Sequence, residues 1–229
     1  MSERIIVAGG TGLIGQRVVD RLVADGGALV LSVQRRENEE TRHGLRVVVD
    51  DGADIDTLAL RLGKSAPPPR AFICALGTTR KVAGSDAAFV AVDRDLVVRI
   101  AKAAFAAGAR HAIVVSSAGA DAKSTNLYLR TKGEMEALVA AIGFTRCDFL
   151  RPGLLIGKRT TRRSAEALMQ TASPLIDAFL KGALKRYRSI DAHDVAEAAV
   201  ILATGDQPAV LVHEFGSLQA LAHGTSPKR

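Results

Sequence analysis

Short apolar runs alternate along the chain with longer segments whose apolar positions recur at helical spacing. Apolar runs without polar alternation predict strands that are buried on both faces, as in a parallel sheet covered by helices. We expect strands near residues 4–8, 28–33, 45–49, 71–75, 111–116 and 144–150, and helices near residues 13–25, 54–63, 86–108 and 127–142. This regular alternation predicts the α/β fold class, a doubly wound parallel sheet with right-handed crossovers and three α/β/α layers.

The pattern changes after Pro152. A basic loop follows at residues 158–163, and we expect helices near 172–183 and 193–204 and a short strand near 210–216. Residues 151–229 should form a small cap on the substrate side of the sheet, where substrate choice would be decided. Because the sequence shows neither an internal repeat nor a long linker, we expect residues 1–229 to form one domain.

A glycine-rich turn lies between the first predicted strand and the first predicted helix. Gly9 allows a sharp turn, Gly12 allows backbone N–H groups to approach a pyrophosphate, and Gly15 allows the helix to pack closely on the strand. The helix N-terminus then faces the phosphates with its unpaired N–H groups and the positive end of its dipole. A glycine-rich turn alone is a weak signal, but this position between strand and helix predicts a Rossmann-type dinucleotide site.

Tyr128 and Lys132 are four residues apart in the helix predicted over residues 127–142, so they share one helix face. A lysine charge near the phenol favours the phenolate and would lower the tyrosine pKa from about 10 toward the neutral range. Ser116 and Ser117 end the buried strand that precedes this helix. Ligands bind at the carboxyl edge of open α/β sheets, so these hydroxyls favour proton-transfer chemistry at that edge.

These motifs resemble those of the short-chain dehydrogenase/reductases, in particular the atypical branch typified by the Tat-interacting-protein-like oxidoreductases. The resemblance covers residues 5 to about 160 and depends, in chain order, on Gly9-Gly10-Thr11-Gly12-Leu13-Ile14-Gly15, Arg35-Arg36, Leu76-Gly77-Thr78-Thr79-Arg80, Val92-Asp93-Arg94-Asp95, Ser116-Ser117-Ala118-Gly119-Ala120-Asp121, Tyr128-Leu129, Lys132-Gly133-Glu134 and Arg151-Pro152-Gly153.

The resemblance implies that Tyr128 is the acid/base, that Lys132 holds the nicotinamide ribose and lowers the tyrosine pKa, and that a serine polarises the substrate carbonyl. We expect this serine to be Ser117, because strand alternation sends only one of the two hydroxyls into the cleft and Ser117 aligns better with the family's catalytic residue. The chain departs from the family at residues 75–78, where ordinary short-chain reductases have Asn-Ala-Gly, and its serine-to-tyrosine spacing is slightly short. Cofactor binding is therefore better supported than turnover.

The second predicted strand ends in Arg35 and Arg36, and Glu37 is the first carboxylate after them. NAD-specific proteins place a carboxylate there, on the ribose 2′-hydroxyl, whereas a guanidinium suits a 2′-phosphate. The sequence therefore predicts NADP(H) over NAD(H). The residues expected to bind the cofactor are Gly9, Thr11, Gly12, Leu13, Ile14, Gly15, Arg35, Arg36, Ala75, Leu76, Gly77, Thr78, Tyr128, Lys132, Pro152 and Gly153.

Composition limits the other partners. The net charge of +7 is accompanied by no nucleic-acid motif and no Trp, so we do not expect nucleic-acid binding. No apolar run approaches the roughly 20 residues that span a bilayer, and the start leads directly into the first strand, so we expect no membrane association and a cytoplasmic location. Cys74 and Cys147 should be buried thiols, and the five histidines have no metal-ligand spacing, so no metal is expected.

Together these features favour an NADP(H)-dependent oxidoreductase that interconverts a carbonyl and an alcohol of an unidentified small molecule by hydride transfer. The altered motif at residues 75–78 leaves an alternative open, an NADPH-binding regulatory module that binds a protein partner or a second copy without turnover. A third interpretation, epimerisation of a nucleotide-sugar through transient oxidation, would need a larger substrate region than the residues after Arg151.

Overall fold

In the computed structural model, which describes residues 3–36, 42–64, 66–157 and 180–224, seven parallel strands form one sheet. The order across the sheet is β3-β2-β1-β4-β5-β6-β9. The strands are β1 (Glu3–Ala8), β2 (Ala28–Gln34), β3 (Leu45–Val49), β4 (Ala71–Cys74), β5 (His111–Val115), β6 (Arg146–Leu150) and β9 (Ala209–His213). The predicted Rossmann-type α/β fold is therefore confirmed.

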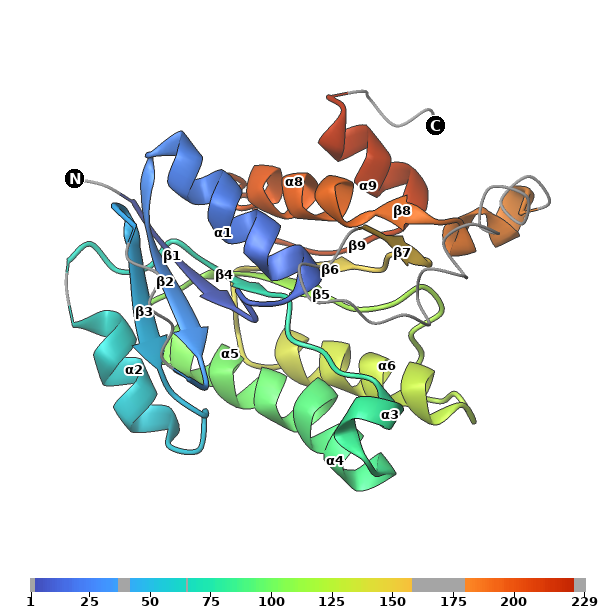
Figure 1. The fold of residues 1–229 in the computed structure, drawn as a ribbon, viewed down its shortest axis with the longest axis horizontal. Coiled ribbons are helices and arrows are strands. Elements are labelled where there is room, and N and C mark those ends of the chain that lie inside the picture. The colour runs from blue at the N-terminus through green and yellow to red at the C-terminus, as the bar shows by residue number, and fades with distance from the viewer. Residues whose placement is uncertain (1–2, 37–41, 65, 158–179, 225–229) are drawn as a thin grey trace.

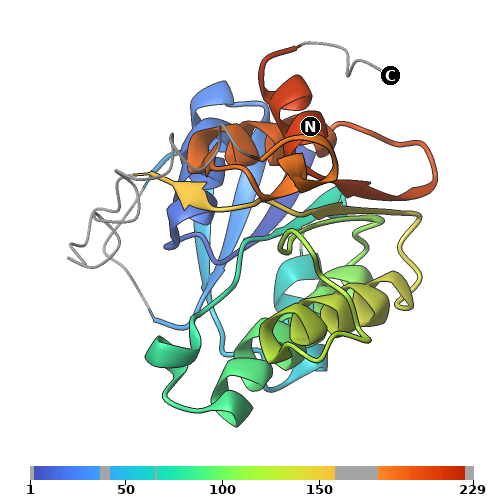
Figure 2. The ribbon, with the colours of Figure 1, turned by 90° about the vertical axis from the view of Figure 1, so that its right-hand side faces the viewer.

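Helices cover both faces of the sheet, as Figure 1 and the side view in Figure 2 show. One layer contains α1 (Leu13–Asp25), α8 (Ala192–Leu202) and α9 (Phe215–Ala222), and the other contains α2 (Ile55–Gly63), α5 (Val97–Ala106) and α6 (Leu127–Ala140). Neighbouring strand residues point to opposite layers, so Ile73 packs under α1 and α8 while Phe72 packs under α5 and α6. Both side chains are fully buried.

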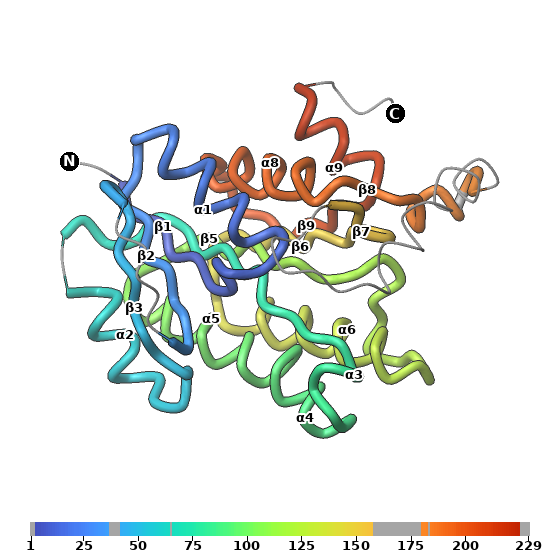
Figure 3. Tube along the Cα trace, in the orientation of Figure 1, coloured from blue at the N-terminus to red at the C-terminus, as the bar shows by residue number. Residues whose placement is uncertain are grey.

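The predicted helix at residues 86–108 is divided into three segments. It consists of α4 (Asp86–Val90), a π-helical segment (Ala91–Leu96) and α5. A further short helix, α3 (Arg80–Ala83), precedes it, and Figure 3 traces the chain leaving β4 to reach this region. Hydrophobic spacing predicted a helix here but could not reveal its π-helical turn. Such turns inside α-helices often occur at functional sites.

The last part of the chain differs most from the prediction. The expected strand at residues 210–216 is shorter and becomes β9 at the edge of the main sheet, and the helix α9 that follows was not predicted. A small second sheet pairs β7 (Leu155–Ile156) with β8 (Ile190–Asp191), and Gly182–Tyr187 forms a 3₁₀-helix. The basic loop at residues 158–163 and most of the helix expected at 172–183 lie outside the described residues.

The strand order reverses between β1 and β4, because the chain adds β2 and β3 on one side of β1 and β5, β6 and β9 on the other side of β4. The connections that follow β1 and β4 therefore diverge to opposite layers and leave a crevice at the carboxyl ends of these two strands. Ligands of open α/β sheets bind at such a switch point.

Candidate functional site

A pocket of about 510 Å³ occupies this crevice. Its walls come from the turn after β1, the ends of β2 and β3, the segment after β4, and the helices α3, α4 and α5 with the π-helical turn between them. The lining residues are Gly9, Thr11, Gly12, Val33, Gln34, Arg35, Asp50, Asp51, Ala75, Leu76, Gly77, Thr78, Val82, Ala83, Ala88, Val92, Leu96 and Ile100. Residues predicted from three separate stretches of sequence are thus brought together around one cavity.

The glycine turn has the geometry of an anion cradle. Gly9 has a φ of +83°, which glycine adopts without strain, and its carbonyl accepts a 2.9 Å hydrogen bond from the Gly12 N–H. Gly12 is the N-cap of α1 and carries no capping side chain, so the first N–H groups of α1 remain available to a ligand. A Cβ on Gly15 would lie 2.1 Å from the Gly9 carbonyl oxygen, so only glycine lets the helix begin this close to the turn.

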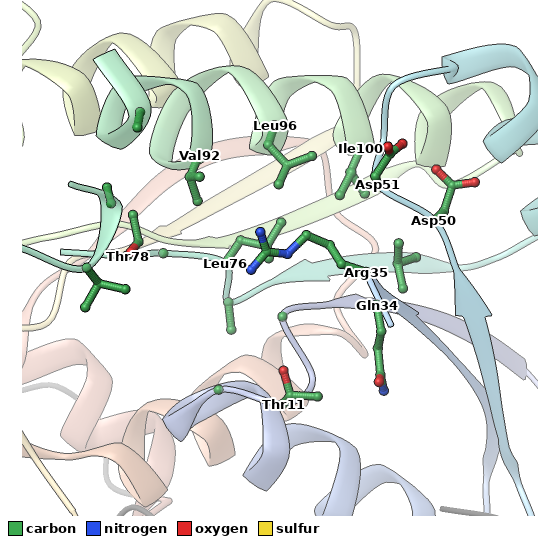
Figure 4. A pocket seen from close by; sticks show the side chains of 18 residues that line it. Thr11, Gln34, Arg35, Asp50, Asp51, Leu76, Thr78, Val92, Leu96 and Ile100 are labelled. Carbon is green, nitrogen blue, oxygen red and sulfur yellow. The ribbon is translucent and has the colours of Figure 1, made fainter. Parts of the chain in front are cut away.

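Arg35 lies at the end of β2 and extends its guanidinium across the pocket (Figure 4). Asp50 and Asp51, which follow β3, face the same cavity from another side. Asp50 is already engaged, because its carboxylate accepts hydrogen bonds from the Gly52 N–H and from Arg61. The pocket therefore presents one extended cation at the place where the sequence predicts a 2′-phosphate.

Asp93, in the π-helical segment, connects α6 with the segment after β4. Its carboxylate lies 2.8 Å from Lys132 Nζ and accepts a 2.8 Å hydrogen bond from the Thr78 backbone N–H. Asp93 is 1% exposed and Lys132 is 4% exposed. A Cβ on Gly77 would lie 3.8 Å from Lys132 Nζ, so the ammonium lies directly behind the pocket wall.

Tyr128 is one helical turn before Lys132 on α6 and is 37% exposed. Its ring stacks on the fully buried Phe89 of α4, with 5.8 Å between the ring centroids. As far as the described residues show, the lining of the pocket includes neither Tyr128 nor Lys132. The two residues lie on the α6 side of the pocket, and the ionic partner of Lys132 is Asp93.

Ser116 and Ser117 differ in their surroundings. Ser117 is half-buried, and its hydroxyl donates a long 3.4 Å hydrogen bond to the Ala118 carbonyl. Ser116 is 5% exposed, and its hydroxyl has no hydrogen-bond partner among the residues that the structure describes. Val114 packs in the core under α5 and α6, so the alternation of β5 places Ser116 on the side of Tyr128 and Lys132. Both hydroxyls therefore need to be tested.

The remaining predicted cofactor residues are not part of the pocket lining that the structure describes. Ile14 packs in the core, and Leu13 could reach a ligand through its backbone N–H at the start of α1. Arg36 is exposed, whereas the carbonyl of the buried Pro152 accepts a hydrogen bond from the Ala118 N–H. A Cβ on Gly153 would lie 2.3 Å from the Arg188 carbonyl oxygen, so this glycine is needed for packing within the chain itself.

Both cysteines are free and buried, as predicted. Burial raises the pKa of the Cys74 thiol to about 11, so this group next to the site is neutral at physiological pH. Among the residues that the structure describes, no cluster of His, Cys, Asp or Glu could hold a metal ion. The helices in the described ranges include none that is long and apolar enough to cross a membrane.

Comparison with known proteins gives a family match over most of the chain. A family model described as NAD(P)H-binding matches residues 9–206. The chain is 36% identical over 188 residues to the protein fmp52, mitochondrial, of Emericella nidulans, which is 81% of this chain and 77% of that protein. It is 48% identical to the protein HTATIP2 of Rattus norvegicus over 95 residues, which is 42% of this chain and 39% of that protein.

Solved structures show the same fold at low sequence identity. MoeE5 in complex with UDP-glucose and NAD aligns with a TM-score of 0.66 at 18% identity and covers 98% of this chain and 83% of its own. UDP-glucose 4-epimerase of Thermotoga maritima aligns with a TM-score of 0.68 at 14% identity and covers 99% and 84%. At this identity the structures confirm the fold, and the HTATIP2 match confirms the resemblance to the Tat-interacting-protein-like branch of the short-chain dehydrogenase/reductases.

The predicted cytoplasmic location is contradicted. Relatives that are 32–36% identical over most of the chain are named mitochondrial proteins, among them those of Emericella nidulans and Scheffersomyces stipitis. The prediction depended on the lack of a membrane-length apolar run and on the start of the chain leading directly into the first strand. Neither observation decides the compartment, and the mitochondrial names of these relatives contradict the prediction.

Proposed function

Because the chain belongs to the NAD(P)H-binding family and groups with the proteins named Fmp52, we propose that it is a single-domain, NADP(H)-dependent oxidoreductase that interconverts a carbonyl and an alcohol. The observation that carries this proposal is the pocket at the switch point, which has a glycine turn at one end and Lys132 behind Gly77 at the other. An uncapped helix N-terminus and an extended arginine fit a phosphorylated dinucleotide.

The roles of the cofactor-binding residues follow from their positions. The turn from Gly9 to Gly12 and the first N–H groups of α1 would hold the pyrophosphate, and Arg35 would hold the 2′-phosphate. The segment from Ala75 to Thr78 forms the wall between these groups and Lys132. Lys132 would reach the nicotinamide ribose from behind this wall.

The proposed catalytic residues act on the carbonyl oxygen of the substrate, which receives a proton during reduction. When bound, the nicotinamide would supply the hydride for reduction. Tyr128 Oη would donate a proton to the carbonyl oxygen, and a serine hydroxyl would polarise that oxygen by hydrogen bonding. Ser117 remains the proposed residue, and Ser116 is the alternative that its burial and unpartnered hydroxyl suggest. Ser116→Ala and Ser117→Ala, assayed side by side, decide which hydroxyl is required.

The experiment that tests the proposal combines binding with turnover. Calorimetric titration with NADPH and NADH should give tighter binding of NADPH, and NADPH oxidation should be detected with at least one member of a panel of aldehydes, ketones and quinones. Equal affinities would contradict the NADP preference. Tight NADPH binding without oxidation across the panel would contradict the enzymatic proposal.

The second candidate is an NADPH-binding regulatory module without turnover. It is favoured by one observation: Tyr128 packs on Phe89, outside the described lining of the pocket, while Lys132 is occupied by Asp93. In this case NADPH would change the affinity for a protein partner or a second copy. The candidate predicts NADPH binding with no oxidation of the cofactor by the panel.

A further inference from the structure

A second cavity, which we call the amino-end cavity, lies where the central strands begin, at the opposite edge of the sheet from the pocket at the switch point. Its volume is about 470 Å³, which is within the range of sites for small molecules. The charged side chains that line it are four arginines and two carboxylates: Arg4, Arg70, Arg110, Arg146, Glu3 and Asp206. A ligand in this cavity would be separate from the cofactor.

The arginines come together because neighbouring strands begin with them. Arg4, Arg70 and Arg110 each precede residues that pair with one another in β1, β4 and β5, so the three lie in one row across the sheet. Arg146 is the first residue of β6, the next strand in the sheet. The strand register therefore gathers guanidinium groups that are far apart in the sequence.

Carboxylates balance only part of this positive charge. Glu3 forms an ion pair with Arg70, and Asp148, behind the wall of the cavity, forms one with Arg146. The negative charge of Asp206 also acts on Arg146. Among the described residues, these three carboxylates are set against the four arginines of the lining, so an excess of positive charge remains at the cavity.

Two of the arginines keep N–H groups that the protein itself does not use. Asp148 accepts hydrogen bonds from Nε and Nη2 of Arg146, and a Cβ on Gly205 would lie 2.9 Å from the remaining nitrogen, Nη1. Arg110 donates through Nη1 to two backbone carbonyl oxygens, and its guanidinium lies 4.7 Å from the centroid of the Phe105 ring. Within the part of the chain that the structure describes, Nη1 of Arg146 and Nε and Nη2 of Arg110 have no acceptor.

We propose that the amino-end cavity binds the phosphate group of a small phosphorylated molecule. Guanidinium groups donate paired, charge-assisted hydrogen bonds to phosphate oxygens. Arg70, Arg110 and Arg146 reach the cavity from the starts of three strands, which suits a phosphate because its oxygens point in several directions, whereas the two oxygens of a carboxylate lie in one plane. The cavity is larger than one phosphate group, so it has room for the rest of an organic monoester.

Calorimetric titration of the full chain with glycerol phosphate, a phosphate monoester, tests this proposal. Chloride holds the ionic strength constant, because salt screens exposed charges. The parent should bind glycerol phosphate at one site, and more tightly than inorganic phosphate or acetate. Absence of binding would overturn the proposal, and tighter binding of either inorganic phosphate or acetate would overturn the assignment to a phosphate monoester.

Gly12→Val shows which of the two cavities binds the probe. This substitution fills the phosphate-binding turn of the pocket at the switch point but leaves the amino-end cavity unchanged. The variant should therefore bind glycerol phosphate with the parent affinity. Loss of this binding in Gly12→Val would place the anion in the cofactor pocket and overturn the proposal.

Substitution of the arginines tests the site itself. Arg110→Gln removes only bonds to backbone carbonyls and a ring contact, so the variant should fold, and its affinity for glycerol phosphate should fall about tenfold. Adding Arg70→Gln should weaken binding further. The matched control is Arg21→Gln, because the side chains of Arg21 and Arg70 are 41% and 34% exposed and each pairs with a carboxylate.

Arg21 lies on α1, and its partner Glu197 lies on α8, so Arg21→Gln should bind glycerol phosphate like the parent. If Arg110→Gln and the double variant bind as tightly as Arg21→Gln, the proposal is overturned. The titration needs neither NADPH nor turnover and does not depend on the proposed oxidoreductase function. A protein that binds glycerol phosphate through these arginines but fails to oxidise NADPH would keep this site and lack that activity.

Discussion

Two buried carboxylates lie in different regions of this molecule and differ in how completely they are satisfied. Asp148, in β6, accepts hydrogen bonds from His111 Nε2 at 2.6 Å, His213 Nε2 at 2.7 Å and Arg146 at 2.6 and 3.2 Å. Asp93 has one ammonium and one backbone N–H as partners and adjoins the wall of the pocket. Burial alone therefore does not distinguish a structural carboxylate from one at a functional site.

The environment of each carboxylate indicates its role. Asp148 connects three strands, because His111 belongs to β5 and His213 to the edge strand β9. Its side-chain donors lie on three neighbouring strands, β5, β6 and β9, which is the pattern of a cluster that stabilises the sheet. Asp93 instead holds a lysine beside Gly77, which lines the cavity of about 510 Å³ at the carboxyl ends of the strands. His111 and Arg146 also line a cavity, the amino-end cavity of about 470 Å³, but it lies at the amino ends of β5 and β6, whereas open α/β sheets bind dinucleotides at the carboxyl ends. The comparison predicts that changes at Asp148 affect stability and that changes around the pocket affect binding.

The largest expected effect is on stability, from Asp148→Asn. Removing the charge leaves Arg146 and two histidines around a neutral amide, and breaking a buried ion pair from one side costs about 3–5 kcal/mol. Urea unfolding should show this loss, while NADPH affinity measured on the folded variant stays at the parent value. A variant as stable as the parent, or one that folds but has lost NADPH binding, would break the distinction between the two regions.

Gly12→Val should show the opposite behaviour. A Cβ at Gly12 would lie 3.2 Å from the Gly9 carbonyl oxygen, and φ is −85°, so the turn can accept a side chain with a small adjustment. The valine methyl groups would then occupy the space of the pyrophosphate. At an NADPH concentration 100 times its dissociation constant the parent should gain about 2.7 kcal/mol of stability, and the variant should gain none.

Thermal melts with and without NADPH make this measurement. Gly15→Ala is the matched control, because its Cβ would overlap the Gly9 carbonyl and should destabilise the protein even without cofactor. A Gly12→Val protein that NADPH stabilises as much as the parent would show that the turn is not the phosphate site.

Arg35→Ala should lower the preference for NADPH over NADH by about 1.5–3 kcal/mol, the value of a charge-assisted hydrogen bond. Arg36→Ala should have a smaller effect, because Arg35 extends across the pocket and the described lining of the pocket does not include Arg36. Calorimetry with both cofactors on both variants gives the comparison. Equal loss of the NADPH preference in the two variants would contradict the proposal that Arg35 is the main ligand of the 2′-phosphate.

The smallest expected effect is the acid dependence of stability. Burial raises the pKa of Asp148, but the hydrogen bonds from His111, His213 and Arg146 outweigh it and hold that pKa below the ordinary value. The unfolded chain therefore takes up this proton first, near pH 3.9, so the contribution is present at neutral pH and is lost as the pH falls. The stability difference between the parent and Asp148→Asn should narrow by up to about 1.4 kcal/mol per pH unit below that point. A difference that stays constant in urea unfolding at lower pH would contradict the assignment.

Much of the sheet could be predicted from sequence because its strands are buried on both faces and produce continuous apolar runs. β1 to β6 were expected on this basis. The same reasoning failed after residue 150, where β9 is a partly exposed edge strand and α9 is a short helix containing Gly216 and Ser217. Short elements with mixed polarity give weak periodic signals.

The parts of the site that are formed by one continuous segment of the chain could be predicted from the sequence. The glycine turn and the end of β2 lie within single segments, and the structure brings them to one pocket. Asp93 belongs to one of the motifs that carry the family resemblance, but the sequence did not predict a role for it, because its partner Lys132 is 39 residues away. Contact between such distant residues depends on the packing of α6 against the π-helical segment, which no local pattern reveals. The cluster of His111 and His213 on Asp148 escaped prediction for the same reason.

The most direct test of the central claim is a comparison of the parent with Tyr128→Phe in NADPH binding and in NADPH oxidation by a carbonyl substrate found in the panel. The substitution keeps the ring that stacks on Phe89 and removes the proton that is transferred. The account predicts unchanged NADPH affinity and a fall in turnover of about 100-fold or more. Turnover by Tyr128→Phe at the parent rate would contradict the assignment of Tyr128 as the acid/base.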